Sequence, residues 1–217
     1  MGRAQVRMVG LGLQDRSDGA SAVMENSREI GADAQFIIDR SEKGEFDQGL
    51  IDWRGMLGSK HWLVLSSSCV LDEGSMKWAW GSSLTFAELE GCKSAMVVDM
   101  PKEPDLLEEA WGSVIERIRQ IHVLFLEPMA MKAISELEGI EEDLLLEEIR
   151  SRSLVPIVCS FDPNQRLAIV SHSLGQEIVQ MNREMVLGEW LAGFLCELPH
   201  SGSGTSGIVS AARSSGP

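Results

Sequence analysis

Residues 62–100, WLVLSSSCVLDEGSMKWAWGSSLTFAELEGCKSAMVVDM, contain two apolar runs separated by a longer segment with helical spacing. The runs at 62–68 and 94–100 have the length of strands and no polar alternation, which is typical of parallel strands covered on both faces. The pattern continues with HVLFLEP at 122–128 and VPIVCSF at 155–161. We therefore predict an α/β fold with a doubly wound, mostly parallel sheet.

The segments between these runs, 73–89, 105–120 and 129–150, have the periodicity of amphipathic helices. Gly139 divides the third segment into two predicted helices, because Glu141 begins a new acidic first turn. The turn composition at 162–165 predicts that 166–173 returns as an antiparallel hairpin at the sheet edge.

Outside this pattern, QVRMVGLGL at 5–13 and AQFIIDR at 34–40 indicate two strands with no crossover helix. We assign them to a small β appendage, residues 1–45, beside an α/β domain at 46–200. The end, 201–217, is rich in Gly and Ser and is interpreted as a tail with a short ordered piece at 208–213.

The composition excludes several classes of function. The 217 residues include 33 acidic and 19 basic side chains, a net charge of −14, which argues against attraction to nucleic acid or anionic lipid. No apolar stretch approaches the roughly 20 residues of a membrane span. The four cysteines and four histidines show no metal-ligand spacing. We expect no metal site, reduced thiols, and a cytoplasmic location or another reducing compartment such as an organelle matrix.

The segment EMVLGEWLAGFL at 184–195 and the serial order of three others point to a known family. The others are IIDRSEKGEFDQGLIDWRGMLGSKHWLVLSSS at 37–68, MVVDMPKEPDLLEEAW at 96–111 and VLFLEPMAMKAISELEG at 123–139. Together, over roughly 34–200, they resemble the PfkB, or ribokinase-like, carbohydrate kinases, and within them the 2-keto-3-deoxygluconate kinase branch. The resemblance implies a ribokinase-like fold in which 1–45 is a lid remnant, with an N-terminally shortened chain.

The resemblance also implies positions for a kinase site. Val186, Leu187 and Gly188 would form the anion hole at the start of a helix, and Glu189 would be the catalytic base that takes the proton of the attacking hydroxyl. From the lid, Arg40 and Lys43 would face an anionic sugar acid. Glu189 equally suits an ordinary acid that complements a helix dipole, and the two lid cations equally suit a solvated loop.

This chain departs from the family at each phosphate-handling motif. The family's Gly-Ala-Gly-Asp reads Val-Leu-Gly-Glu at 186–189, and its Asn-x-x-Glu has Glu127 and Ala130 at the two named positions. Its Thr-x-Gly turn becomes Ser-Phe-Asp at 160–162, where a ring and a negative charge oppose phosphate. We therefore predict a non-catalytic structural or interaction protein, a pseudo-kinase, that needs no cofactor. The alternatives are an active sugar or sugar-acid kinase using ATP and Mg²⁺, and a nucleotide or sugar sensor.

The tryptophans suggest a contact surface. Trp78 and Trp80 stand two apart on a predicted helix, so they point to different sides and at least one is a candidate interface residue. The shortened start also predicts an uncovered sheet face near Trp62. We therefore expect a homodimer or a subunit of a larger protein complex.

Overall fold

Eight strands form one sheet in the computed structural model, which describes residues 4–38, 46–72, 74–202 and 204–214. Within these residues the strand order is β2-β1-β3-β4-β5-β6-β7-β8. The strands are β1 (Arg7–Leu11), β2 (Asp33–Phe36), β3 (Trp62–Ser66), β4 (Lys93–Val98), β5 (Val123–Leu126), β6 (Ile157–Asp162), β7 (Leu167–His172) and β8 (Gly175–Gln180). The pairs from β2 to β6 are parallel, and β7 and β8 continue the sheet antiparallel at one edge. The predicted mostly parallel sheet is confirmed.

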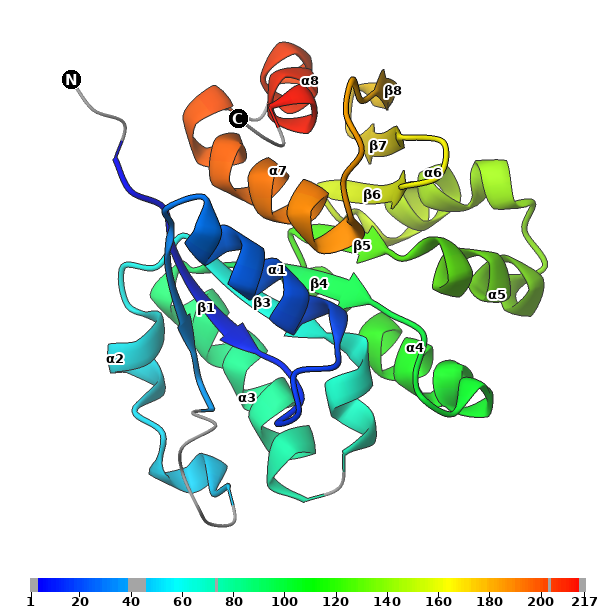
Figure 1. Ribbon diagram of the computed structural model, residues 1–217. Coiled ribbons are helices and arrows are strands. Elements are labelled where there is room, and N and C mark those ends of the chain that lie inside the picture. The colour runs from blue at the N-terminus through cyan, green and yellow to red at the C-terminus, as the bar shows by residue number, and fades with distance from the viewer. Residues whose placement is uncertain (1–3, 39–45, 73, 203, 215–217) are drawn as a thin grey trace.

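Helices cover both faces of the sheet (Figure 1). One layer contains α1 (Gly19–Glu29), α7 (Leu187–Ser201) and α8 (Thr205–Arg213). The opposite layer contains α2 (Trp53–Leu57), α3 (Ser75–Glu90), α4 (Leu107–Glu116), α5 (Pro128–Glu138) and α6 (Glu142–Ser153). Short 3-10 segments lie at Gln48–Leu50, Ser67–Leu71, Pro104–Leu106 and Ile118–Gln120. No helix in the described ranges is long and apolar enough to cross a bilayer.

The four predicted apolar runs form β3, β4, β5 and β6, and consecutive side chains are buried in opposite layers. On β3, Leu63 packs in the core beneath α3 and α4, whereas Trp62 and Val64 pack in the core beneath α1 and α7. The Trp62 indole N–H donates to the Leu195 carbonyl of α7 over 2.8 Å. The expectation of an uncovered face near Trp62 is wrong, because α1 and α7 cover it.

The first segments are part of the sheet and do not form a separate appendage. β1 pairs with β2 on one side and β3 on the other, and both pairs are parallel. The crossover helix between β1 and β2 is α1, whose sequence GASAVMENSRE has few large apolar residues. Its N-cap Asp18 accepts a hydrogen bond from the Ser21 backbone N–H, which starts the helix. Apolar periodicity did not predict this helix, because α1 is short and its apolar stripe is narrow.

Three further local predictions concern the break at Gly139, the hairpin at the sheet edge and the C-terminal segment. Gly139 ends α5 with φ 64°, and α6 begins at Glu142, as predicted. The predicted hairpin of β6 and β7 is confirmed, and β8 extends it. The C-terminal segment is more ordered than a tail. α8 buries Ile208 and Ala211, and the Ala212 carbonyl accepts from the Trp190 indole N–H of α7 over 3.2 Å.

The two neighbouring tryptophans of α3 point to different environments, as predicted. Trp78 is 71% exposed, whereas Trp80 is 3% exposed and donates its indole N–H to the Ser66 carbonyl. Trp80 is therefore a core residue, and its proposed role at an interface is corrected. The other four tryptophans are also buried.

Candidate functional site

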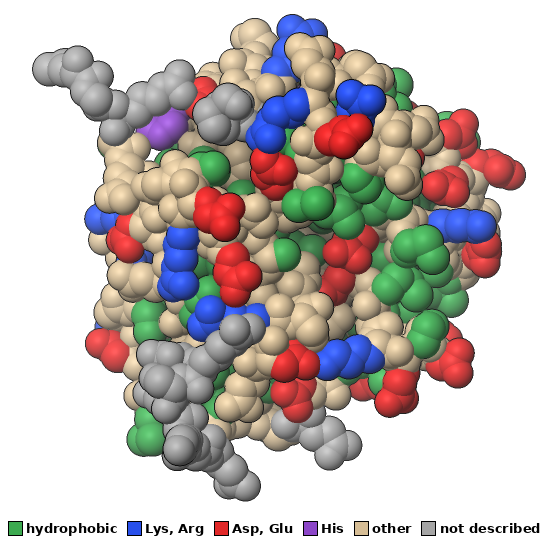
Figure 2. Space-filling view, in the orientation of Figure 1, with side chains coloured by type: hydrophobic (Ala, Val, Ile, Leu, Met, Phe, Trp, Pro, Cys, Tyr) green, Lys and Arg blue, Asp and Glu red, His purple; other side chains and the backbone are tan. Residues whose placement is uncertain are grey.

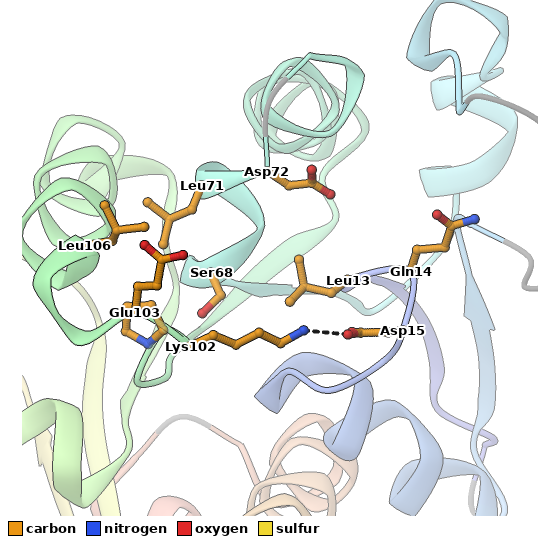
Figure 3. A pocket seen from close by; sticks show the side chains of 10 residues that line it. Leu13, Gln14, Asp15, Ser68, Leu71, Asp72, Lys102, Glu103 and Leu106 are labelled. Carbon is orange, nitrogen blue, oxygen red and sulfur yellow. Dashed lines mark hydrogen bonds and ion pairs between the residues drawn. The ribbon is translucent and has the colours of Figure 1, made fainter.

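A cavity of about 540 Å³ opens at the carboxyl ends of β1, β3 and β4. β1 continues to β2 on one side, and the chain then returns to β3 on the other side of β1. Such a reversal of strand order is where ligands bind in open α/β sheets. The cavity is lined by the loops after these strands, with the residues Leu13, Gln14, Asp15, Ser68, Leu71, Asp72, Pro101, Lys102, Glu103 and Leu106 (Figure 3).

The charged side chains of this crevice are mostly acidic. Lys102 extends from the loop after β4 and contacts Asp15 of the loop after β1, with 2.5 Å between Nζ and Oδ2 (Figure 3). The hydrogen bond from Lys102 is the main reason that the pKa of Asp15 lies well below its usual range. Asp72 and Glu103 also line the cavity. With one cation against three carboxyl groups, the lining favours neutral or cationic ligands over polyphosphates.

Behind the crevice, the Asp99 side chain is held by a cluster of hydroxyl groups. It accepts hydrogen bonds from the hydroxyls of Ser66 at 2.8 Å, Ser67 at 3.1 Å and Ser68 at 2.9 Å. The backbone N–H of Gly19, the first residue of α1, donates to it over 2.9 Å. Asp99 is 5% exposed. The chain thus satisfies this buried acid with its own donors.

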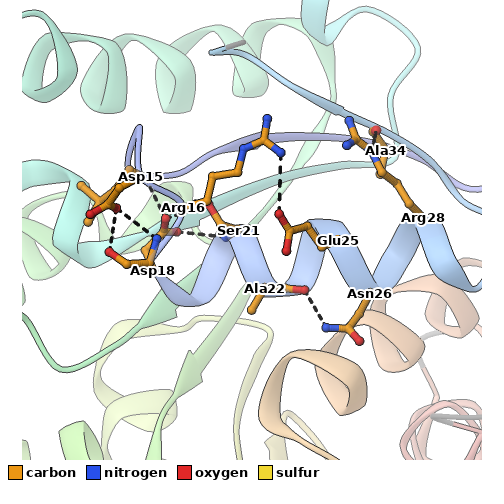
Figure 4. Close-up of polar contacts among 11 residues, drawn as sticks. Asp15, Arg16, Asp18, Ser21, Ala22, Glu25, Asn26, Arg28 and Ala34 are labelled. Carbon is orange, nitrogen blue, oxygen red and sulfur yellow. Dashed lines mark hydrogen bonds and ion pairs between the residues drawn. The ribbon is translucent and has the colours of Figure 1, made fainter. Parts of the chain in front are cut away.

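A second buried acid, Asp18, caps α1 (Figure 4). It accepts from the backbone N–H groups of Leu13 and Ser21 and from the Ser21 hydroxyl, at 2.8, 2.9 and 2.7 Å. Gly12 lies so close that a β-carbon there would stand 2.7 Å from an Asp18 oxygen. Burial is the largest cause that raises the pKa of Asp18.

A third acid, Glu127, follows β5 and completes the group. Its pKa is raised to about 7, chiefly by burial and then by the nearby carboxyl groups of Asp99 and Asp18, against a hydrogen bond from the Met100 backbone that lowers it. A β-carbon on Gly19 would lie 3.3 Å from Glu127 Oε1. The start of α1, a place where helices bind anions, is therefore surrounded by carboxyl groups of the chain itself.

The turn predicted as the anion hole lies at the start of α7 and is packed against α1. A β-carbon on Gly188 would stand 3.0 Å from the Ala22 β-carbon and 3.1 Å from its carbonyl carbon. Val186 is the N-cap residue and 62% exposed, and Leu187 is partly buried. None of these three residues lines the crevice. They lie at the N-terminus of a helix, as predicted for an anion hole, but α1 packs against this N-terminus.

Glu189, the predicted base, lies in the first turn of α7 and is paired. Its Oε1 stands 2.7 Å from Nη2 of Arg183, in the segment that leads into the helix. It does not line the crevice. This arrangement matches the alternative interpretation of an acid that complements a helix N-terminus. Arg40 and Lys43 lie outside the described residues.

The nucleotide and metal that a kinase would use fit these residues poorly. Among the described residues, no group of three or more His, Cys, Asp or Glu side chains is arranged to hold a metal ion. The crevice has Lys102 as its single cationic side chain, and that side chain is already paired with Asp15. The donor set therefore offers little to a polyphosphate with its magnesium ion.

The sequence reasoning placed Glu127 at a motif position and quoted the segment that contains Asp99, but it did not place Asp15, Asp18 or Lys102 in a site. A signal was present, because Asp18 follows the β1 segment and precedes a small-residue helix start. Asp18 could be recognised as a site residue only if β1 was assigned to the central sheet. The sequence reasoning did not make that assignment, because it did not predict helix α1 between β1 and β2.

No protein-family model matches the chain, and no curated protein matches it. Solved structures of carbohydrate kinases match its fold. Fructokinase from Xylella fastidiosa, with bound ATP, is 11% identical with a TM-score of 0.64, covering 98% of this chain and 76% of that chain. Fructokinase from Vibrio cholerae, with fructose, ADP and calcium ion, is 12% identical with a TM-score of 0.63, covering 95% of this chain and 89% of that chain.

A third similar structure is 2-dehydro-3-deoxygluconokinase from Thermotoga maritima, 13% identical with a TM-score of 0.61, covering 97% of this chain and 77% of that chain. These neighbours are carbohydrate kinases of the PfkB and ribokinase type, as the sequence resemblance indicated. At such identities the likeness concerns the fold. The chain has the ribokinase-like α/β fold.

Proposed function

We propose that this chain is a non-catalytic protein on a carbohydrate-kinase scaffold and that it acts by binding another protein chain. The observation that carries the first part is the start of α7. Gly188 is packed against Ala22 of α1, and Glu189 is paired with Arg183 at 2.7 Å.

Phosphoryl transfer depends on positioning and on donors aimed at the developing charge. A general base must also come within about 3 Å of the proton that it takes. Here the candidate base would first have to leave Arg183, and the helix start would have to separate from α1. At the start of α1, the backbone N–H groups of Gly19 and Ser21 already donate to Asp99 and Asp18, so they are not available to a phosphate.

Binding to a partner is supported by Trp78, which is 71% exposed while the other five tryptophans of the chain are buried. Tryptophan is enriched among the residues that dominate protein interfaces. A reducing compartment is part of this proposal, because all four cysteines are free thiols and three of them are buried.

One observation favours an alternative. The 540 Å³ crevice stands at the switch point of the sheet and combines polar groups with an apolar wall, as a small-molecule site does. It supports a sensor that binds a sugar without transfer. A sugar or sugar-acid kinase with ATP and Mg²⁺ is the other alternative, and it would also need Glu189, which lies outside the crevice and is paired with Arg183, as its base.

Calorimetric titration with ATP and Mg²⁺ tests whether the start of α7, which is packed against α1, can bind a nucleotide. We expect no saturable heat and no rise in melting temperature for the wild type. The same result is expected for Arg183→Ala, which frees Glu189 but leaves α1 against Gly188. A native-state ligand at a hundred times its Kd would add about 2.7 kcal/mol of stability, which a melting curve detects. Saturable binding of ATP and Mg²⁺ by the wild type, with a rise in its melting temperature, would contradict the proposal.

A further inference from the structure

A second cavity, of about 510 Å³, lies between α3 and α4 in the layer that carries Trp78. Its apolar wall includes Val70, Trp80 and Phe86, and Trp78 is on its border. Trp78 is 71% exposed, whereas Trp80 is 3% exposed. We call this cavity with its border the α3–α4 cleft. A mostly exposed tryptophan beside an apolar hollow is the arrangement of a docking site.

The cleft carries cations although the chain as a whole is strongly acidic. Arg117 extends over Gly81, where a β-carbon would stand 3.6 Å from Nη2. No described residue forms an ion pair with Arg117. Lys77 lies 3.3 Å from Glu109 of α4 in an exposed pair, and Glu116 also lines the cleft. A guanidinium fork next to an aromatic face suits a carboxylate attached to an apolar group.

The same helical layer contains a segment with the complementary character. Residues 136–148, where α5 turns into α6, hold seven acids and no Lys or Arg. Leu137 is 46% exposed and Leu144 is 50% exposed within it. Figure 2 shows hydrophobic side chains gathered on the side of the molecule where α4 and α5 lie, with acidic side chains toward the outer edge. We call 136–148 the α5–α6 corner.

The two surfaces lie on either side of α4. Lys77 of α3 pairs with Glu109 of α4, and α4 in turn contacts α5. A two-fold axis near α4 could therefore bring each cleft against the corner of the other copy, so that the same contact forms twice. A stable interface of standard size buries roughly 800 Å² per partner, which the two equivalent contacts would have to supply together.

We propose that the chain forms a two-fold dimer in which the α5–α6 corner of one copy occupies the α3–α4 cleft of the other. This inference rests on the proposed binding function and names its partner as a second copy. An exposed leucine, Leu144, lies against Trp78, and the neighbouring carboxylates of Glu142 and Asp143 face Arg117 and Lys77. The contact joins the one exposed tryptophan to exposed leucines and pairs charges of opposite sign.

Sedimentation equilibrium of the full chain tests the pairing at about 0.15 M salt, where charges beyond about 8 Å are screened. We expect a wild-type dimer. Trp78→Ala should raise its dissociation constant at least tenfold, because an interface tryptophan carries a large share of the affinity. Leu174→Ser, which changes a 70% exposed leucine between β7 and β8, is the matched control and should leave the constant unchanged.

A charge exchange makes the test specific to this geometry. Arg117→Glu alone, or Glu142→Arg with Asp143→Arg, should each weaken the dimer at least tenfold, because like charges then meet in both contacts. Mixing the two variants should restore the dimer, since each contact again joins opposite charges. These positions are exposed, and melting curves check that both variants fold.

A monomeric wild type, a dimer insensitive to the exchange, failure of the mixture to restore it, or an equal loss in Leu174→Ser would overturn the inference. None of these results bears on the separate proposal that the chain does not transfer phosphate. A dimer that obeys the exchange but phosphorylates sugar would instead overturn the proposed function.

Discussion

At the scale of single residues, the carboxyl edge of the sheet is dominated by three acids that the chain satisfies or neutralises itself. Asp99 is surrounded by serine hydroxyls, and Asp18 caps α1. Glu127 has fewer donors, and its pKa is raised to about 7. A protonated Glu127 avoids a third charge beside two other acids, so its charge state varies near neutral pH.

Glu127→Gln is predicted to remove a pH-dependent loss of stability. The folded chain holds the Glu127 proton up to about pH 7, whereas the unfolded chain releases it near its usual 4.5. The unfolded state therefore binds fewer protons in this window, and the free energy of unfolding falls as pH rises, by up to about 3 kcal/mol. Urea unfolding at pH 5 and pH 8 should show a larger loss of stability in the wild type than in the variant.

Other groups titrate in the same window, so the difference between variant and wild type is the quantity to compare. Burial lowers the pKa of His61 and His122, which adds stability as pH rises through their usual 6.5. Asp18 acts in the same direction as Glu127. Equal pH dependence in Glu127→Gln and wild type would show that Glu127 is ionised in the folded state throughout.

At the scale of elements, α1 packs against the start of α7, the segment to which the family resemblance assigned phosphate binding. The parallel strands β3 to β6 could be predicted, because each of them is buried on both faces and forms a continuous apolar run such as Trp62–Ser66. The role of β1, α1 and β2 could not. Crossover helix α1 presents small and polar residues, and its burial beneath α7 depends on contacts with residues more than 150 positions away. The close contact between Gly188 and Ala22 is a consequence of that packing.

Gly188→Ala is predicted to destabilise the chain by about 1–3 kcal/mol, the range for forcing an extra methyl into a packed contact. The new β-carbon would press on the Ala22 side chain and backbone at 3.0 and 3.1 Å. The matched control is Gly112→Ala in α4, where a β-carbon meets nothing within 4 Å. That change should stabilise by about 0.5–1 kcal/mol, because alanine favours helix. Denaturant unfolding measures the free energy of unfolding of both variants. Equal effects of the two changes would contradict the close packing of Gly188 against α1.

At the scale of the whole molecule, two surfaces remain available for function. The crevice at the switch point has an acidic lining and a paired Lys102, and the helical layer on the other face of the sheet exposes Trp78. The sequence predicted an exposed tryptophan from the spacing of Trp78 and Trp80. It did not predict the crevice, whose side chains come from three loops that only the complete sheet brings together. The scaffold of a kinase is thus present, with its candidate base outside the crevice at the switch point.

The most direct test of this account is ADP production from ATP and Mg²⁺ with fructose, ribose or 2-keto-3-deoxygluconate as acceptor. The account predicts that the wild-type rate equals the sugar-free background and that Glu189→Gln does not change it, because Glu189 is held by Arg183 and α7 starts against α1. Loss of a working general base typically costs about a hundredfold to ten-thousandfold in rate. A sugar-dependent wild-type rate that falls by such a factor in Glu189→Gln would contradict the account.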